Sequence, residues 1–284
     1  MHIGLCTFPT GTSISPADLA RAAEERGFES LWVAEHSHIP VSRRTPWPGG
    51  AELPRMYYEV VDPFVALAMA AAATHTLKLA TGVCLLAQRD PIQTAKQVAS
   101  LDALSGGRFL FGIGGGWNVE EMANHGTDAR ARWKILRERV EALKEIWARD
   151  EAAYHGEHVD FDPIFAWPKP AQKPHPPIHV GGAFPWGMRR AIRYGDGWIP
   201  LLGRGDDDVV HHLPALRAEA EHAGRDAASI EVSVYGAPPR AETLARFRDA
   251  GITRCLLFVP PISRDAALPA LDSYAALAHG LARG

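Results

Sequence analysis

The sequence predicts an α/β protein, a (β/α)₈ TIM barrel with a lid loop after strand 2 and an excursion before strand 5. Eight short apolar runs alternate with eight segments of helical period along the 284 residues. Runs such as LKLATGVCLL and LLFV are apolar without alternation, which is typical of parallel strands buried on both faces. The first strand-to-helix turn contains only Gly11 and lacks the G-x-G-x-x-G pattern of a doubly wound dinucleotide-binding sheet. We therefore expect one barrel domain spanning residues 1–284.

Each predicted strand is a short run of β-forming residues that leads into a turn and then a helix. The strands cover residues 2–8, 30–36, 77–86, 108–114, 178–181, 197–202, 230–235 and 254–259. In the first helix, Ser15 is a plausible N-cap, Pro16 occupies the first helical position, and Gly27 ends the apolar 3.6-residue period. Similar signals predict helices over residues 63–74, 91–104, 130–148, 185–194, 208–223, 241–250 and 265–278.

Two connections are longer than a plain barrel requires. Residues 37–59 follow the second strand and are rich in Pro, Gly and Arg. This stretch also carries Trp47, Tyr57 and Tyr58, which predicts a lid whose aromatic residues exclude water. Residues 151–177 contain AYHGEHVDFD, which predicts a short hairpin before a proline-rich return.

Composition narrows the classes of function. The chain has 30 Lys and Arg against 33 Asp and Glu, a net charge of −3, so a nucleic-acid surface is not expected. The apolar run over residues 63–73 is too short to cross a bilayer, and we expect no signal peptide before the first strand. Cys6, Cys84 and Cys255 lie far apart, which indicates reduced core thiols of a cytoplasmic protein.

Catalytic residues of such barrels lie at the carboxyl ends of the strands. The second strand ends in Glu35-His36-Ser37-His38, where a histidine tuned by a neighbouring carboxylate suits proton transfer. His36 and His38, with His179 on the fifth strand, leave open a metal-dependent hydrolase as an alternative. The eighth strand ends in Val-Pro-Pro without the aspartate that such a site needs, so no metal is expected.

Glycines mark three further strand ends, where bare backbone allows close approach of a ligand. They occur in Thr81-Gly82-Val83, in residues 112–116 before Trp117, and in Gly181-Gly182-Ala183. The last group precedes a helix and predicts an anion site of backbone amides, with a flexible turn as the alternative. Arg189 and Arg190, farther along that helix, are interpreted as a solvated face.

Taken in order, these segments resemble the luciferase-like monooxygenase superfamily. The matching stretches are AEERGFESLWVAEH (23–36), LATGVCLL (79–86), AKQVASLDALSGGRFLFGIGGGW (95–117), HVGG (179–182) and GDGW (195–198). The lid segment EHSHIPVSRR (35–44) is similar to the subgroup that uses the deazaflavin coenzyme F420.

The resemblance implies an oxidoreductase that transfers a hydride between F420 and a small organic substrate. His36 is expected to be catalytic with Glu35 beside it, and the position of Gly82-Val83 resembles that of a non-proline cis peptide behind the cofactor ring. Cys84 is expected behind the ring and not as a nucleophile. The implied cofactor-binding residues are His36, Thr81, Gly82, Val83, Gly115, Gly116, Trp117, Gly181, Gly182 and Ala183.

Three departures from the family pattern bear on cofactor and substrate. Trp117 and Glu35 stand where sugar-phosphate dehydrogenases of the superfamily carry Glu and Asp, and Gly115 replaces the arginine of an FMN-phosphate site. The last departure favours F420 over FMN, because an FMN enzyme would lose one charge-assisted contact. The alternatives are an FMN-dependent monooxygenase with a partner flavin reductase and a non-catalytic flavin-binding barrel. The resemblance also implies a homodimer.

Overall fold

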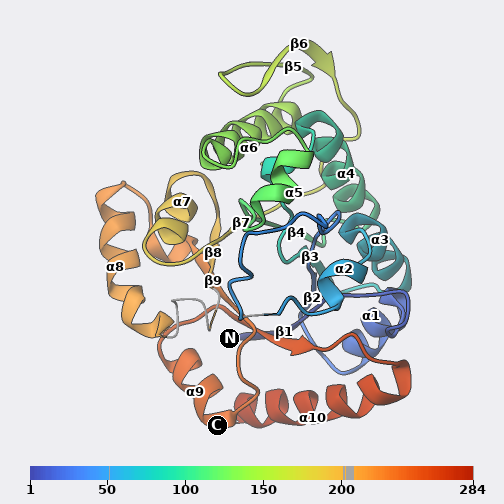
Figure 1. Ribbon diagram of the computed structural model, residues 1–284. Helices are drawn as coiled ribbons and strands as arrows, with labels where there is room; N and C mark the ends of the chain where they lie inside the picture. Colours follow the sequence, from blue (N-terminus) through green and yellow to red (C-terminus); the bar gives the residue numbers. More distant parts are fainter. Residues whose placement is uncertain (51, 201, 203–207, 284) are drawn as a thin grey trace.

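The computed structural model describes residues 1–50, 52–200, 202 and 208–283, and its centre is a closed barrel of parallel strands (Figure 1). Around the barrel the strands follow the order β1-β10-β9-β8-β7-β4-β3-β2. Their bounds are β1 His2–Thr7, β2 Ser30–Val33, β3 Lys78–Thr81, β4 Phe109–Ile113, β7 Ile178–Gly181, β8 Gly197–Ile199, β9 Glu231–Tyr235 and β10 Arg254–Val259. The first and last strands pair from His2 with Arg254 to Thr7 with Val259, which closes the barrel. The predicted fold class is confirmed.

One long helix follows each barrel strand and covers the outside of the barrel (Figure 1). These helices are α1 Pro16–Glu25, α3 Pro63–Ala73, α4 Pro91–Leu104, α6 Arg132–Ala148, α7 Trp186–Tyr194, α8 Val209–His222, α9 Ala241–Asp249 and α10 Arg264–Arg283. Ser15 caps α1 as predicted, its Oγ accepting from the amide of Asp18 at 3.1 Å. Among the described residues, no helix is both long and apolar enough to cross a membrane.

Three predicted strands end well before the predicted position. The strand predicted over 30–36 ends at Val33. The strand predicted over 77–86 ends at Thr81, and a 3₁₀ turn, Leu86–Gln88, follows. Beyond Thr81, Cys84 still donates its amide to Gly112 O at 2.8 Å, so this segment stays beside β4 without continuing the regular ladder. The strand predicted over 197–202 ends at Ile199, and residue 201 lies outside the described residues.

The structure adds short helices that the periodicity did not reveal. They are α2 Met56–Glu59 in the lid and α5 Val119–Asn124 directly after the β4 glycines, and a 3₁₀ turn at Ala227–Ser229 precedes β9. Both α-helices are too short to show an apolar stripe of helical period.

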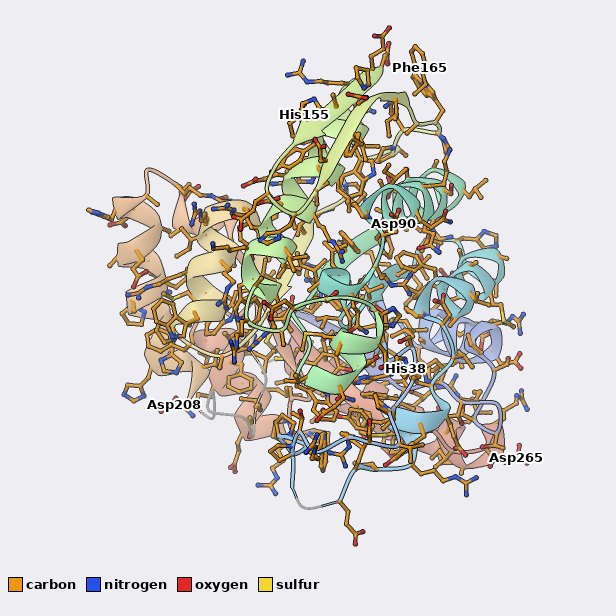
Figure 2. The ribbon with its side chains drawn as sticks, turned by 45° about the horizontal axis from the view of Figure 1, so that its top comes forward. His38, Asp90, His155, Phe165, Asp208 and Asp265 are labelled. Atoms are coloured by element: carbon orange, nitrogen blue, oxygen red, sulfur yellow. The ribbon has the colours of Figure 1, made fainter. Side chains whose placement is uncertain are left out.

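The two long connections take the predicted positions. β5 Glu151–His155 and β6 Asp160–Phe165 form an antiparallel hairpin between α6 and β7. Figure 2 shows His155 and Phe165 at this hairpin, away from the barrel mouth. The lid after β2 packs its apolar residues on the end of the barrel, where Tyr57 joins Phe8 and Ala34 in a buried cluster.

The barrel interior differs between its two ends. Apolar side chains, among them Trp32, Leu110 and Leu256, fill the middle. At the amino ends of the strands the buried Arg254 guanidinium donates to Glu29 and Glu231, each at 2.8 Å. Because this ionic group closes the amino end, ligand access is left to the carboxyl end.

Candidate functional site

A pocket of about 320 Å³ opens at the carboxyl ends of the barrel strands. Its size lies in the usual range for small-molecule sites. The predicted site residues that line it are Glu35, His36, Gly82, Val83, Gly115, Gly116, Trp117, Gly181, Gly182 and Ala183. Thr81 does not line the pocket; it is fully buried, and its hydroxyl donates to Gly112 O at 2.7 Å. Thr81 therefore acts on the site by fixing β3 against β4.

The centre of polar chemistry in the pocket is His36, which follows β2. Its Nδ1 lies 2.7 Å from Oε2 of Glu121, a buried carboxylate on α5. The other oxygen of Glu121 accepts from Gln88 Nε2 and from the amide of Ser37, each at 3.0 Å. Burial raises the pKa of Glu121, but the hydrogen bond and charge interaction with His36 and the bond from Gln88 outweigh it, so the pKa lies below its usual value. Glu121 is therefore a carboxylate that orients the imidazole.

The tautomer of His36 follows from its second partner. Trp117 Nε1 lies 3.2 Å from His36 Nε2, and an indole N–H is only a donor. His36 Nε2 must then be the acceptor, which leaves the ring proton on Nδ1 facing Glu121. The arrangement presents an oriented imidazole whose Nε2 lone pair accepts from Trp117, a residue that also lines the pocket.

Glu35 has a different task from the one predicted. Its carboxylate accepts from the amide of Leu85 and from Arg89 Nε, both at 2.6 Å, and Arg89 also pairs with Asp62 at 2.9 Å. The expectation that Glu35 tunes His36 is corrected: Arg89 and the Leu85 amide bind the Glu35 carboxylate, whereas His36 Nδ1 faces Glu121. Glu35 instead ties β2 to the segment after β3.

The floor of the pocket is bare backbone. The peptide bond between Gly82 and Val83 is cis, as the resemblance implied. A Cβ at position 82 would lie 2.9 Å from Tyr235, and a Cβ at position 114 would lie 2.6 Å from Val83. Side chains are therefore excluded where a flat ring would lie against the strand ends.

Gly115 occupies the position at which an FMN-phosphate site has an arginine. A Cβ at this position would lie 2.6 Å from the Trp133 ring, at the start of α6. Trp133 itself lines the pocket. The indole therefore occupies the space that a side chain at position 115 would need.

The turn from β7 to α7 brings two backbones into contact. Gly182 has φ +148°, and a Cβ on Gly187 would collide with Gly182 O. The amide of Gly182 donates to Ile199 O at 3.3 Å, so it is engaged in the barrel. The amide of Ala183 has no acceptor among the described residues, which leaves it to a ligand at the N-terminus of α7.

The lid contributes one aromatic wall to the pocket. Tyr57 is buried, lines the pocket and lies 5.2 Å from the His36 ring, while Trp47 packs on Tyr57 at 5.6 Å between centroids. Tyr58 was expected in the same wall, but its side chain is 55% exposed. The correction follows from α2, since adjacent helical residues point in different directions.

The histidines considered as metal ligands do not form a cluster. His38 bonds Ser37 and Asn124, each at 2.9 Å, and Figure 2 shows it beside α5. His179 is fully buried within the barrel. Among the described residues, the one group with metal-ligand geometry is Glu138, Glu157 and His158, which lies at the excursion and not in the pocket.

The three cysteines are free and buried. Burial and then the charge of Glu35 raise the pKa of the Cys84 thiol well above its usual value. A thiol held protonated is a poor nucleophile, so Cys84 acts as packing behind the pocket floor.

Sequence reasoning missed Glu121, Trp133, Phe8 and Tyr235, all of which border the site. A signal for Glu121 existed, because Asn118 and Glu121 have the N-cap and N3 spacing of a capping box. Asn118 indeed accepts from the Glu121 amide at 3.4 Å. Nothing in the sequence pattern links Trp133 to the pocket.

Comparison with known proteins places this geometry in a family. The family described as "Luciferase-like monooxygenase" matches residues 12–276. An uncharacterised protein of Mycobacterium tuberculosis (strain ATCC 25618 / H37Rv) is 40% identical over 97% of this chain and 98% of its own length.

Two further proteins extend the comparison. The F420-dependent glucose-6-phosphate dehydrogenase of Kineococcus radiotolerans is 31% identical over 77% of this chain and 61% of its own length. The crystal structure of a monooxygenase from Streptomyces bottropensis has a TM-score of 0.79 and 21% identity, covering 98% of this chain and 99% of that one. The chain belongs to the luciferase-like monooxygenase family, whose members are oxidoreductases that use F420 or a flavin.

Proposed function

We propose that this protein is an F420-dependent oxidoreductase that transfers a hydride between the deazaflavin and a small organic alcohol or carbonyl compound. The observation that carries the proposal is the His36–Glu121 pair at the pocket, in which Nε2 of His36 is the acceptor atom beside Trp117. Hydride transfer to or from an oxygen-bearing carbon requires such a group, because a proton must move when the hydride does. The relative from Kineococcus, named as an F420-dependent dehydrogenase, supports the same class of reaction.

The residues have distinct parts in this reaction. The bound deazaflavin would supply the hydride donor or acceptor of the reaction. His36 Nε2 accepts the hydroxyl proton when an alcohol is oxidised, once the substrate hydroxyl has replaced Trp117 Nε1 at this nitrogen, and returns it when a carbonyl is reduced. Glu121 keeps the ring in one tautomer and stabilises the imidazolium that forms. Tyr57 and Trp47 cover the pocket on the lid side and exclude water.

The pocket fits a flat ring attached to a phosphate-bearing chain. Gly82 and Gly114 leave room against the strand ends, and the free amide of Ala183 lies at the N-terminus of α7. Trp133 fills the space beside Gly115 where an FMN-type arginine would lie, which removes one charge-assisted phosphate contact. These observations favour F420 over FMN as the cofactor of this chain.

Parallel titrations of the purified protein with F420 and with FMN test the proposal. We expect saturable F420 binding and weaker FMN binding. Reduced F420 should then be consumed with a panel of small carbonyl compounds, and oxidised F420 with the corresponding alcohols. Tight FMN binding without F420 binding would contradict the proposal and indicate a monooxygenase that draws electrons from a partner reductase. Stoichiometric zinc in the purified protein would instead indicate the hydrolase alternative.

A further inference from the structure

A second depression lies beside the pocket, between α6 and α7. We call it the basic groove; Trp133, Lys134, Arg137, Trp186, Arg190 and Arg193 line it. Arg189 also contributes, and no carboxylate is among the described lining residues. Trp133 lines both the groove and the central pocket, so the two spaces share a wall.

The cations of the groove are only partly neutralised. Arg189 pairs with Glu219 at 2.8 Å, whereas Lys134 and Arg137 are 3.8 Å and 3.6 Å from the nearest glutamate oxygens. No carboxylate of the described residues lies within ion-pair distance of Arg190 or Arg193. Like charges held together without counter-charges favour an anionic occupant.

The groove is also ordered by its aromatic residues. The Arg190 guanidinium stacks 3.6 Å from the centroid of Trp133, and Arg132 lies on the same ring at 5.1 Å. Arg189 lies over Trp186 at 5.4 Å. These contacts correct the interpretation of Arg190 as a solvated residue: its side chain is half-buried against the wall of the pocket. Stacking fixes the guanidinium plane and leaves its edge free to bind carboxylates.

The location of the groove indicates whether its anion is part of the substrate or of the cofactor. The acid–base residue His36 and the lid residue Tyr57 lie at the β1 and β2 side of the pocket, where a substrate would meet them. The groove lies on the other side, along α7, the helix that follows the turn with the free amide of Ala183. Residues 186, 190 and 193 then follow one face of α7 away from that amide.

We propose that the basic groove binds a chain of carboxylates that continues beyond the phosphate of the coenzyme. F420 has this chemistry, since an oligoglutamate chain follows its phosphodiester, whereas FMN ends at its phosphate. The assignment rests on the proposed function. The groove would also let the protein prefer F420 over FMN through contacts that are separate from those to the deazaflavin ring.

Fluorescence titrations with two probes test the groove: F420 with its oligoglutamate chain, and the deazaflavin chromophore without phosphate or chain. The variant is Arg190→Gln/Arg193→Gln. The control is Arg21→Gln, an exposed arginine on α1 paired with Asp18. We expect the double variant to bind full F420 about tenfold more weakly, as for loss of one charge-assisted contact, and to bind the chromophore as the wild type does. Added KCl should weaken F420 binding more in the wild type than in the variant.

Each other result has a defined meaning. Equal loss for both probes would overturn the groove assignment, because it would show a general disturbance of the Trp133 wall. Unchanged F420 binding in the double variant would also overturn it, and would leave the groove to an acidic substrate. If the wild type bound neither deazaflavin, the proposed function itself would fail together with the groove assignment.

Discussion

Glu35 and Glu121 show how differently two buried carboxylates at one pocket are used. Glu35 is bound by Arg89 and the amide of Leu85, whereas Glu121 is bound by His36, Gln88 and Ser37. The first balances a cation, and the second faces a group that gains charge when it takes a proton. A carboxylate beside an imidazole stabilises the imidazolium and fixes its tautomer.

Replacing Glu121 with Gln should lower kcat by about 10²-fold with a smaller change in cofactor affinity, since oriented acid–base groups are worth that much. The amide can donate to Nδ1 and so favour the wrong tautomer. A neutral partner also stabilises the imidazolium less, which adds to the loss of rate.

Steady-state rates from pH 5 to 9 and cofactor titrations check the Glu121→Gln result, with His36→Ala as the reference for complete loss of the proton acceptor. A variant with wild-type kcat would remove Glu121 from the mechanism.

At the scale of elements, helix α5 joins the lid to the acid–base pair. Glu120 and Glu121 are adjacent in this helix and point to different sides. Glu120 accepts from the amide of Arg44 at 2.9 Å and from Thr45 Oγ1 at 2.7 Å. The hydrogen bonds from Thr45 and Arg44 lower the pKa of Glu120 to about 2, which marks a carboxylate that holds the lid while ionised.

Glu120→Gln should therefore loosen the lid without disturbing His36. We expect KM for the substrate to rise several-fold while kcat changes less, because the lost contacts hold the lid and not the reacting atoms. Faster amide exchange over residues 38–50 would accompany the change. A fall in kcat equal to that of Glu121→Gln would show that α5 acts as one unit and would contradict the separation of roles.

The contact between α7 and the end of β7 offers a second test at this scale. Gly187→Ala places a Cβ against Gly182 O, so the turn must move and the Ala183 amide with it. We expect weaker cofactor binding and a lower Tm. Gly280→Ala is the matched control, because this helical glycine has no atom within 4 Å of the added Cβ. The Gly280→Ala variant should bind the cofactor as the wild type does, and its free energy of unfolding should rise by up to about 1 kcal/mol. Unchanged cofactor binding in Gly187→Ala would argue against a tight turn as part of the site.

For the whole molecule, acid stability should depend on groups at the closed end of the barrel. His179 is fully buried, and neither ring nitrogen has a hydrogen-bond partner in the described part of the chain. Burial lowers its pKa from 6.5 to about 4; the charge of Glu231 opposes this shift, and that of Arg254 adds to it. Glu29 faces Arg254, and although burial raises the Glu29 pKa, that guanidinium outweighs burial and brings it to about 2.

These shifts predict two separate pH windows. Between pH 6.5 and 4 the unfolded state binds a proton at residue 179 that the folded state does not, so stability falls as the pH falls. The loss is about 3 kcal/mol. Below pH 4.5 the Glu29 carboxylate is protonated first in the unfolded state, and its contribution is lost toward pH 2.

Urea unfolding at pH 7, 5.5 and 4.5 checks the first window. His179→Leu should flatten the pH dependence there, and the exposed His2→Leu should leave it as in the wild type. An equal slope in wild type and His179→Leu would show that the buried imidazole is not the group responsible.

Much of the fold was predictable because its signals are local. Ser15 and Pro16 mark the start of the first helix and Gly27 marks its end. Apolar runs without alternation predicted parallel strands. The bare backbone at Gly82, Gly115 and Gly182 was predictable for the same reason. A glycine often marks a position where a side chain does not fit or where φ is positive. Partners were not predictable: Glu121 is 85 residues from His36 in sequence.

The sequence by itself determined the barrel, its family, the three glycine strand ends and His36 as the candidate proton carrier. Only the tertiary structure decided which carboxylate His36 faces, that Trp117 fixes its tautomer, and that Trp133 and Arg190 join a basic groove to the pocket. The physical reason is the range of the forces. Capping, propensity and periodicity act within a few residues, whereas the closure of the barrel brings distant strand ends together, and only then do their side chains acquire partners.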